Sequence, residues 1–253
     1  MPSRDEITEA LGRLDDLTRR LRRECPWDRE QDERSIVPHT VEEAGDAPAA
    51  VERLDALTRR LRVECPWDRE QDERTIVPHT VEEAYELAAA ANAGDDAKLL
   101  DELGDVLFQV HFLSLLLEER GAGDLAQVAE GIRTKLVRRH PHIFGEVQAD
   151  SAGEVLTNWD AIKATEPGRE AGIFGEVPEN LPGPLYARKV IRRARSAGID
   201  VPVPDVEAAA RGAEDFDSVG DLLFACVALA RERKVDPELA LRAAADRFRA
   251  AHE

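Results

Sequence analysis

The chain has 253 residues and a formal net charge of −18 at pH 7, which is long enough for one large or two small domains. The acidic balance argues against a nucleic-acid-binding surface, which needs a basic patch, but it leaves room for an anionic ligand in a local basic pocket. No apolar run reaches the roughly 20 residues of a membrane-spanning helix, and the first residues lack the features of a signal peptide. Three cysteines without metal-ligand spacing favour a reduced, cytoplasmic protein.

A direct repeat occupies the N-terminal third. Residues 14–44 and 54–84 match at an offset of 40 and differ at three pairs of positions. No third copy follows, so a helical solenoid is not expected. The first copy runs into Gly45-Asp46-Ala47-Pro48, which breaks a helix where the third carboxylate of the motif should stand. We therefore take the second copy as the functional one and residues 1–50 as an extension that activity does not require.

The second copy opens with an amphipathic helix. Leu54, Leu57 and Leu61 keep helical spacing, and the helix should end before Pro66, because the residue before a proline disfavours helical geometry. Cys65 has no second cysteine in CxxC spacing, so we interpret it as a packed structural residue.

The stretch from Thr80 to Asp105 carries the strongest chemical signal. Glu83 and Glu86 are three residues apart, as are Glu102 and Asp105, so each pair shares a helix face, with Glu82 one turn from Glu86. The turn signal at residues 92–96 should fold the two helices antiparallel and bring the carboxylates together. Such a cluster repels itself unless a cation binds, and hard oxygen ligands suit Mg²⁺ or Mn²⁺.

An explanation without a metal also exists for part of this stretch. A capping box between Thr80 and Glu83, at a helix start, accounts for the first acidic residues. It does not account for Glu102 and Asp105, because the helix that continues over residues 106–117 is apolar on nearly every side and is predicted to be buried. Carboxylates that enter a buried helix need partners, which favours the metal site.

Two later helices carry basic residues. The first holds Lys135 and Arg139 four residues apart near its C-terminal end; the second, opened by a capping box at residues 151–154, holds Trp159 and Lys163. Basic residues favour helix ends and solvated faces in any protein. However, only 5 of the 34 basic residues are lysines, and two of them stand here. Solvation and phosphate binding therefore stay open as explanations.

The C-terminal part resembles a worn copy of what precedes it. After a linker at residues 167–180, the chain is predicted to be helical over 181–253. The segment Gly220–Phe224 repeats the pattern of Gly104–Phe108, but Ser218 stands where the first half has Glu102. We expect this degenerate half to pack and not to catalyse.

The order of these motifs resembles the MazG family. The matching segments are CPWD at 65–68, EExxE at 82–86, ExxD at 102–105, KLVRRHPH at 135–142 and WxxxK at 159–163. The two acidic motifs alone are shared with all-α dUTPases, dCTP pyrophosphatases and phosphoribosyl-ATP pyrophosphatases, whereas the full order is more specific. The resemblance is strong over residues 54–166 and weak over 181–253.

The resemblance implies an all-α helical bundle that works as a homodimer, with a catalytic domain at residues 51–166. It also implies hydrolysis of nucleoside triphosphates to monophosphate and pyrophosphate, as nucleotide-pool house-cleaning. Two alternatives stay open. One is a nucleotide-binding or interaction bundle without turnover; the other is a narrow-specificity relative such as a dUTPase or phosphoribosyl-ATP pyrophosphatase. The basic residues argue against the first, and the CPWD and RRHPH segments argue against the second.

The resemblance also implies a role for each matching residue. Mg²⁺ would be held by Glu83, Glu86, Glu102 and Asp105. Glu82 or Glu86 would accept the proton of the attacking water. The substrate would be contacted by Lys135, Arg138, Arg139, Trp159 and Lys163.

Overall fold

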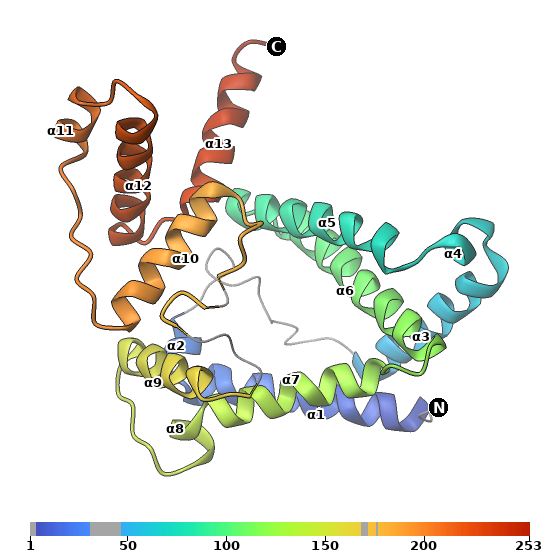
Figure 1. Cartoon of the computed structure of the whole chain (residues 1–253). Coiled ribbons are helices and arrows are strands. Elements are labelled where there is room, and N and C mark those ends of the chain that lie inside the picture. The colour runs from blue at the N-terminus through green and yellow to red at the C-terminus, as the bar shows by residue number, and fades with distance from the viewer. Residues whose placement is uncertain (1–3, 31–46, 168–171, 176) are drawn as a thin grey trace. The chain divides into compact units, whose positions relative to one another are not determined.

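The computed structural model describes residues 4–30, 47–167, 172–175 and 177–253 (Figure 1). Over these ranges the chain forms helices and no strands, which confirms the all-α prediction. The chain divides into two compact units, Met1–Ile162 and Lys163–Glu253, and each is described by itself. Among the described residues, no helix is both long enough and apolar enough to cross a membrane.

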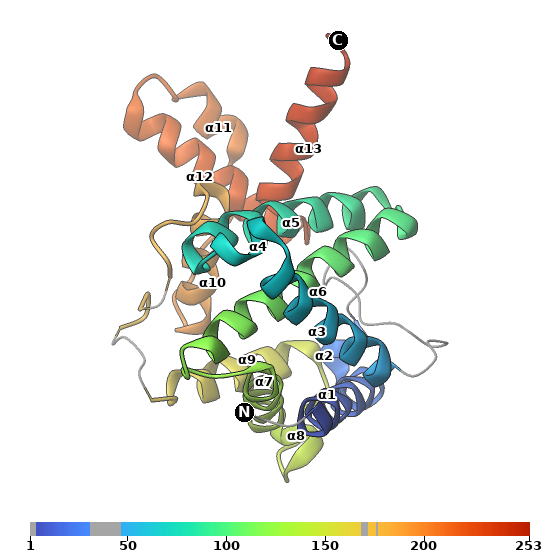
Figure 2. The ribbon, with the colours of Figure 1, turned by 90° about the vertical axis from the view of Figure 1, so that its right-hand side faces the viewer.

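The first unit consists of an α-helical hairpin, the helices of the two repeat copies and the helices that follow the hairpin in the chain. Its helices are α1 (Arg4–Glu24), α2 (Pro26–Arg29), α3 (Ala47–Glu64), α4 (Pro66–Glu70), α5 (Glu73–Ala93), α6 (Asp96–Glu119), α7 (Leu125–Arg139), α8 (Pro141–Phe144) and α9 (Ala152–Ala164). Helices α5 and α6 pack along each other, α1 lies along α7, and α3 contacts both α1 and α6 (Figures 1 and 2).

Helix α5 begins earlier than the sequence suggested. Asp72 is its N-cap: one carboxylate oxygen accepts hydrogen bonds from the amides of Arg74 (2.8 Å) and Thr75 (2.9 Å), and the Asp72 amide donates to the Thr75 hydroxyl. The expected capping box at Thr80 is therefore wrong, because Thr80 lies inside the helix and its hydroxyl donates to the Ile76 carbonyl. Pro78 lies inside the helix, beyond its first turn, where it removes the backbone hydrogen bond to the Arg74 carbonyl and its ring crowds that carbonyl.

The turn between α5 and α6 confirms the prediction for residues 92–96. Gly94 ends α5 with φ of 69°, a left-handed conformation that glycine adopts without strain. The carboxylate of Asp95 accepts from the Lys98 amide and caps α6. The two helices then bury a shared apolar cluster: Leu87, Ala90, Ala91 and Leu99, with Leu103 and Val106 packed against it.

Helix α6 is buried on only part of its surface. Phe112, Leu115 and Leu116 are buried as predicted, but Leu107 and Val110 are 39% and 38% exposed. The prediction of burial on nearly every side is thus wrong for one chain by itself, since α5 and α3 cover only part of the helix.

The first copy of the repeat contributes to the core of the first unit. An apolar cluster joins α1 to α9 and the loop before it, and consists of Leu17, Leu21, Cys25, Ala149 and Val155. Three of these five residues belong to the first copy, so the expectation that residues 1–50 are dispensable is wrong as far as packing is concerned. The carboxylates of the first copy, Glu42 and Glu43, lie outside the described residues.

The second copy packs against a different helix. Arg59 on α3 donates to both carboxylate oxygens of Glu118 on α6, at 3.0 and 2.6 Å, and also pairs with Asp55 at 2.9 Å. Arg62 reaches Glu119 in the same way. As predicted, α3 ends before Pro66, and the short α4 follows.

The second unit contains α10 (Gly183–Ser196), α11 (Val206–Arg211), α12 (Phe216–Glu232) and α13 (Pro237–Ala250). Ile191, Val227 and Ala228 form its buried core, and α10 contacts both α12 and α13. The finer division into a linker at 167–180 and a degenerate half at 181–253 stays a prediction.

Candidate functional site

Three of the predicted metal ligands converge on the α5–α6 hairpin. Ligand oxygens of Glu83, Glu86 and Glu102 all lie within 4.8 Å of one another, because the two pairs of carboxylates face each other across the antiparallel helices. Glu102 is only 5% exposed. Asp105, one turn further along α6, is exposed and lies outside this trio.

The electrostatics show that these carboxylates are poorly compensated. The pKa of Glu83 is raised by burial, and further by the negative charges of Asp105, Glu86, Glu102 and Glu82. The pKa of Glu102 is raised by burial and by Glu86, while the ammonium of Lys98, 3.7 Å away, opposes the shift. Like charges held close together create a need for a cation.

The geometry of the trio fits a magnesium ion. Oxygen atoms bound to one Mg²⁺ at about 2.1 Å are at most about 4.2 Å apart, so small side-chain rotations would bring these oxygens onto a common ion. The donor set contains oxygen alone, which also suits Mn²⁺. The family resemblance and the acidic cluster together support a divalent ion.

Glu82 lies on the solvent side of α5. Its carboxylate is 3.2 Å from Nδ1 of His79, and its side chain is 69% exposed. It therefore stands beside the trio and not within it, which leaves its oxygens open to solvent.

Two of the predicted substrate-binding residues, Arg139 and Trp159, lie in contact in the first unit. The guanidinium carbon of Arg139 lies 5.0 Å from the centre of the Trp159 ring, and His140 meets the same ring edge-on at 5.2 Å. Lys135 and Arg138 are exposed on α7, and Lys163 follows Trp159 by one turn of α9. Helices α7 and α9 thus bring Arg139 and Trp159 together.

The carboxylates and the basic end of α7 stand on different elements. Helices α6 and α7 meet at the turn between Glu119 and Leu125 and then run apart (Figures 1 and 2). A single chain therefore does not gather the acidic trio and the basic residues of α7 into one pocket.

One residue beside the acidic trio was missed by the sequence analysis. Lys98 is four residues before Glu102, and this spacing was the available signal for their ion pair. Lys98, Asp101, Glu102 and Gly104 line a surface hollow next to the trio. This hollow offers an anionic ligand a cationic contact at the edge of the acidic cluster.

Comparison with known proteins decides the family. The MazG nucleotide pyrophosphohydrolase domain matches residues 71–144, the segment that holds the acidic motifs and the basic end of α7. The nucleoside triphosphate pyrophosphohydrolase of Escherichia coli K12 is 36% identical over 260 residues, which cover 94% of this chain and 84% of the relative. The chain belongs to the MazG family. A MazG protein of Thermotoga maritima is also 36% identical, over 88% of this chain and 76% of the relative.

Other MazG relatives match part of their length. The nucleoside triphosphate pyrophosphohydrolase of Mycobacterium tuberculosis is 31% identical over 136 residues, or 53% of this chain and 41% of the relative. The similarity therefore covers most of this chain in some relatives and about half of it in others.

Proposed function

We propose that this MazG protein hydrolyses nucleoside and deoxynucleoside triphosphates between the α and β phosphates, giving the monophosphate and pyrophosphate. The observation that carries the proposal is the convergence of Glu83, Glu86 and Glu102, with Glu102 buried and the pKa values of Glu83 and Glu102 raised. We also propose that free nucleotides in the cytoplasm are the substrates, as nucleotide-pool house-cleaning, since the net charge of −18 disfavours nucleic acid.

In this proposal the acidic residues divide into two roles. Glu83, Glu86, Glu102 and Asp105 hold Mg²⁺, or Mn²⁺ in its place. When bound, the ion supplies positive charge that neutralises the phosphate oxygens. Glu82, or a carboxylate oxygen of Glu86 that is not needed as a ligand, accepts the proton of the attacking water; the exposure of Glu82 gives it access to that water.

The basic residues bind the substrate. Lys135, Arg138, Arg139 and Lys163 contact the phosphates, and Trp159 stacks on the base. The contact of Arg139 with the Trp159 ring orients the guanidinium, whose planar set of N–H donors suits phosphate oxygens.

A homodimer would join the two groups of residues. The α5–α6 hairpin exposes large apolar side chains, Val77, Val81, Leu107 and Val110, each between 38% and 50% exposed. A second copy of the hairpin could cover them in a four-helix arrangement. The acidic trio of one chain would then face the basic residues of its partner.

A panel of nucleoside and deoxynucleoside triphosphates, with the products identified, tests the activity. We expect pyrophosphate and monophosphate, no turnover in EDTA, and near-complete loss in Glu86→Gln and Asp105→Asn. Release of inorganic phosphate in place of pyrophosphate, or turnover in EDTA at the full rate, would contradict the proposal.

Mixing two impaired variants tests the dimer, at nucleotide concentrations far below the KM of Arg139→Ala, where both variants are nearly inactive. If each site combines residues of two chains, Glu86→Gln and Arg139→Ala copies unfolded and refolded together should regain activity, because some mixed dimers contain one intact site. Mixtures that stay inactive despite mixed-dimer formation would contradict a shared site.

A further inference from the structure

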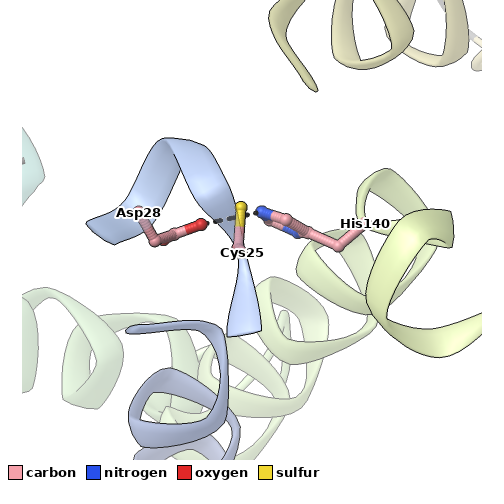
Figure 3. Close-up of side chains that lie close together, drawn as sticks. All are labelled: Cys25, Asp28 and His140. Carbon is pink, nitrogen blue, oxygen red and sulfur yellow. Dashed lines mark ion pairs between the residues drawn. The ribbon is translucent and has the colours of Figure 1, made fainter. Parts of the chain in front are cut away.

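A second group of metal-binding side chains lies far from the acidic trio. Cys25 follows α1, Asp28 lies on α2, and His140 separates α7 from α8 (Figure 3). Ligand atoms of these three residues lie within 4.8 Å of one another. Cys25 is 0% and His140 is 1% exposed, whereas Asp28 is half-buried, and Cys25 belongs to the apolar cluster that joins α1 to α9.

The orientation of His140 points to a ligand. Its Nδ1 lies 2.6 Å from the Leu136 carbonyl, which can only accept, so Nδ1 carries a proton, and in the neutral imidazole Nε2 then has the lone pair. Nε2 is aimed at Asp28 Oδ2, 3.4 Å away; both atoms are buried, and they form an ion-pair contact without hydrogen-bond geometry (Figure 3). Metal-binding histidines commonly donate their other ring nitrogen to a carbonyl in this way.

His142 offers a fourth donor beside Cys25, outside the trio whose ligand atoms all lie within 4.8 Å of one another. Its Nε2 lies 3.2 Å from Sγ of Cys25. Two ligands of a tetrahedral zinc ion, at about 2.0 to 2.3 Å from the metal, are about 3.3 to 3.5 Å apart. The distances from His140 to Asp28 and from His142 to Cys25 are therefore close to those of neighbouring zinc ligands.

We propose that Cys25, Asp28, His140 and His142 form a structural zinc site that fastens the first copy of the repeat to the α7–α8 junction. One sulfur, two imidazole nitrogens and one carboxylate form a donor set that zinc accepts and magnesium does not. Four protein ligands fill a tetrahedral shell and leave no open position, so the site holds structure together and does not activate water. The complete burial of Cys25 also argues against its use as a nucleophile.

The second copy provides an internal comparison. Cys65 and Asp68 occupy the same motif, CPWD, but Cys65 is only half-buried, and no metal-binding group that includes it is found among the described residues. His79, further along the same copy, packs against Trp67 instead. Cys65→Ser is therefore a matched control for Cys25→Ser: the same substitution in the same motif, without the histidines.

Cobalt absorption of the full chain tests the proposal. The zinc-depleted protein is titrated with Co²⁺ in excess Mg²⁺, which occupies the oxygen site. We expect a thiolate-to-cobalt charge-transfer band together with visible bands of a tetrahedral ion, at about one Co²⁺ per chain. The carboxylate trio cannot produce the charge-transfer band, because it has no sulfur.

The variants assign the ligands. Cys25→Ser should lose the charge-transfer band, His140→Gln and His142→Gln should weaken Co²⁺ and Zn²⁺ binding, and Cys65→Ser should match the parent. After gel filtration, the parent and Cys65→Ser should each retain about one Zn²⁺ per chain. Cys25→Ser should retain almost none. A parent protein without the charge-transfer band, or a Cys65→Ser variant that loses it, would overturn the proposal.

Discussion

Glu102 is the buried member of the acidic trio, and both its burial and the negative charges beside it raise its pKa. Because the pKa values of Glu83 and Glu102 are raised above the ordinary 4.5, the metal-free folded chain holds more protons than the unfolded chain above that pH. Its stability therefore falls as the pH rises through this window. Mg²⁺ needs both carboxylates ionised, so its stabilising effect should grow over the same window.

This pH dependence gives the first prediction. Saturating Mg²⁺ should raise the melting temperature more at about pH 7.5 than at about pH 5. Glu102→Gln should raise the melting temperature of the metal-free chain at the higher pH and remove most of the magnesium effect. Asp101→Asn, which changes an exposed neighbour, is the control and should keep the effect. Differential scanning fluorimetry measures all three, and an undiminished magnesium shift in Glu102→Gln would exclude this residue as a ligand.

A second prediction at a single residue concerns Arg139, which is proposed to bind the phosphates. A lost hydrogen bond to a charged group costs about 1.5 to 3 kcal/mol, so Arg139→Ala should raise the KM for nucleoside triphosphates about ten- to a hundredfold. Arg139→Lys should recover little, because it loses the planar contact with Trp159. Arg133→Ala, which removes a pair with Glu130 on the same helix, is the control. Steady-state kinetics decide, and an unchanged KM in Arg139→Ala would place substrate elsewhere.

Helix α5 shows how a cap can be misread from sequence. Both Asp72 and Thr80 stand three residues before a side chain that could complete a capping box. However, the Asp72 carboxylate accepts hydrogen bonds from two backbone amides, whereas the Thr80 hydroxyl donates to a carbonyl within the helix. Asp72→Ala should lower the free energy of unfolding by about 1 kcal/mol, and Thr80→Ala by clearly less. Urea denaturation of both variants provides the measurement, and equal losses would restore Thr80 as the functional cap.

The two copies of the repeat allow a matched comparison of helices α1 and α3. Leu21 is 2% exposed, whereas its counterpart Leu61 is half-buried. Leu21→Ala should therefore destabilise the first unit by about 2 to 5 kcal/mol, and Leu61→Ala by less. Denaturant unfolding followed by circular dichroism ranks the two variants. The reverse ranking would show that the second copy occupies the place beside α7.

At the scale of the whole molecule, we predict that one half catalyses and the other does not. In the second unit Ser218 is part of a capping box with Asp215, so α12 begins two residues before the serine. Helix α6 starts six residues before Glu102, and this extra length carries Lys98. On the prediction that the second unit is a degenerate copy, its counterpart of Glu102 starts a helix and its counterpart of α5 is the short α11.

The corresponding experiment compares two equivalent substitutions. Asp221→Asn should leave kcat unchanged, because no other carboxylate of the motif stands in register with it. Asp105→Asn should nearly abolish kcat, since it removes a proposed metal ligand. Initial rates at saturating nucleotide and Mg²⁺ distinguish the two, and a large loss in Asp221→Asn would give the second half a part in catalysis.

Interactions that span a few residues could be predicted from the sequence. The glycine turn at Gly94, the helix break before Pro66 and the spacing of Glu83, Glu86 and Glu102 depend on local geometry, and each is present in the structure. The order of the motifs was also sufficient to predict the family, because such motifs consist of residue types at fixed spacings along the sequence.

The partners of the two repeat copies depended on the tertiary structure. Arg19 and Arg59 make equivalent pairs with Asp15 and Asp55 on their own helices, and Arg59 also reaches Glu118 on α6. Cys25 is fully buried beside His142, whereas Cys65 is not. Near-identical segments have nearly the same local preferences, so their different surroundings arise from packing against residues more than a hundred positions away in the first copy and about sixty in the second. No local pattern contains that information.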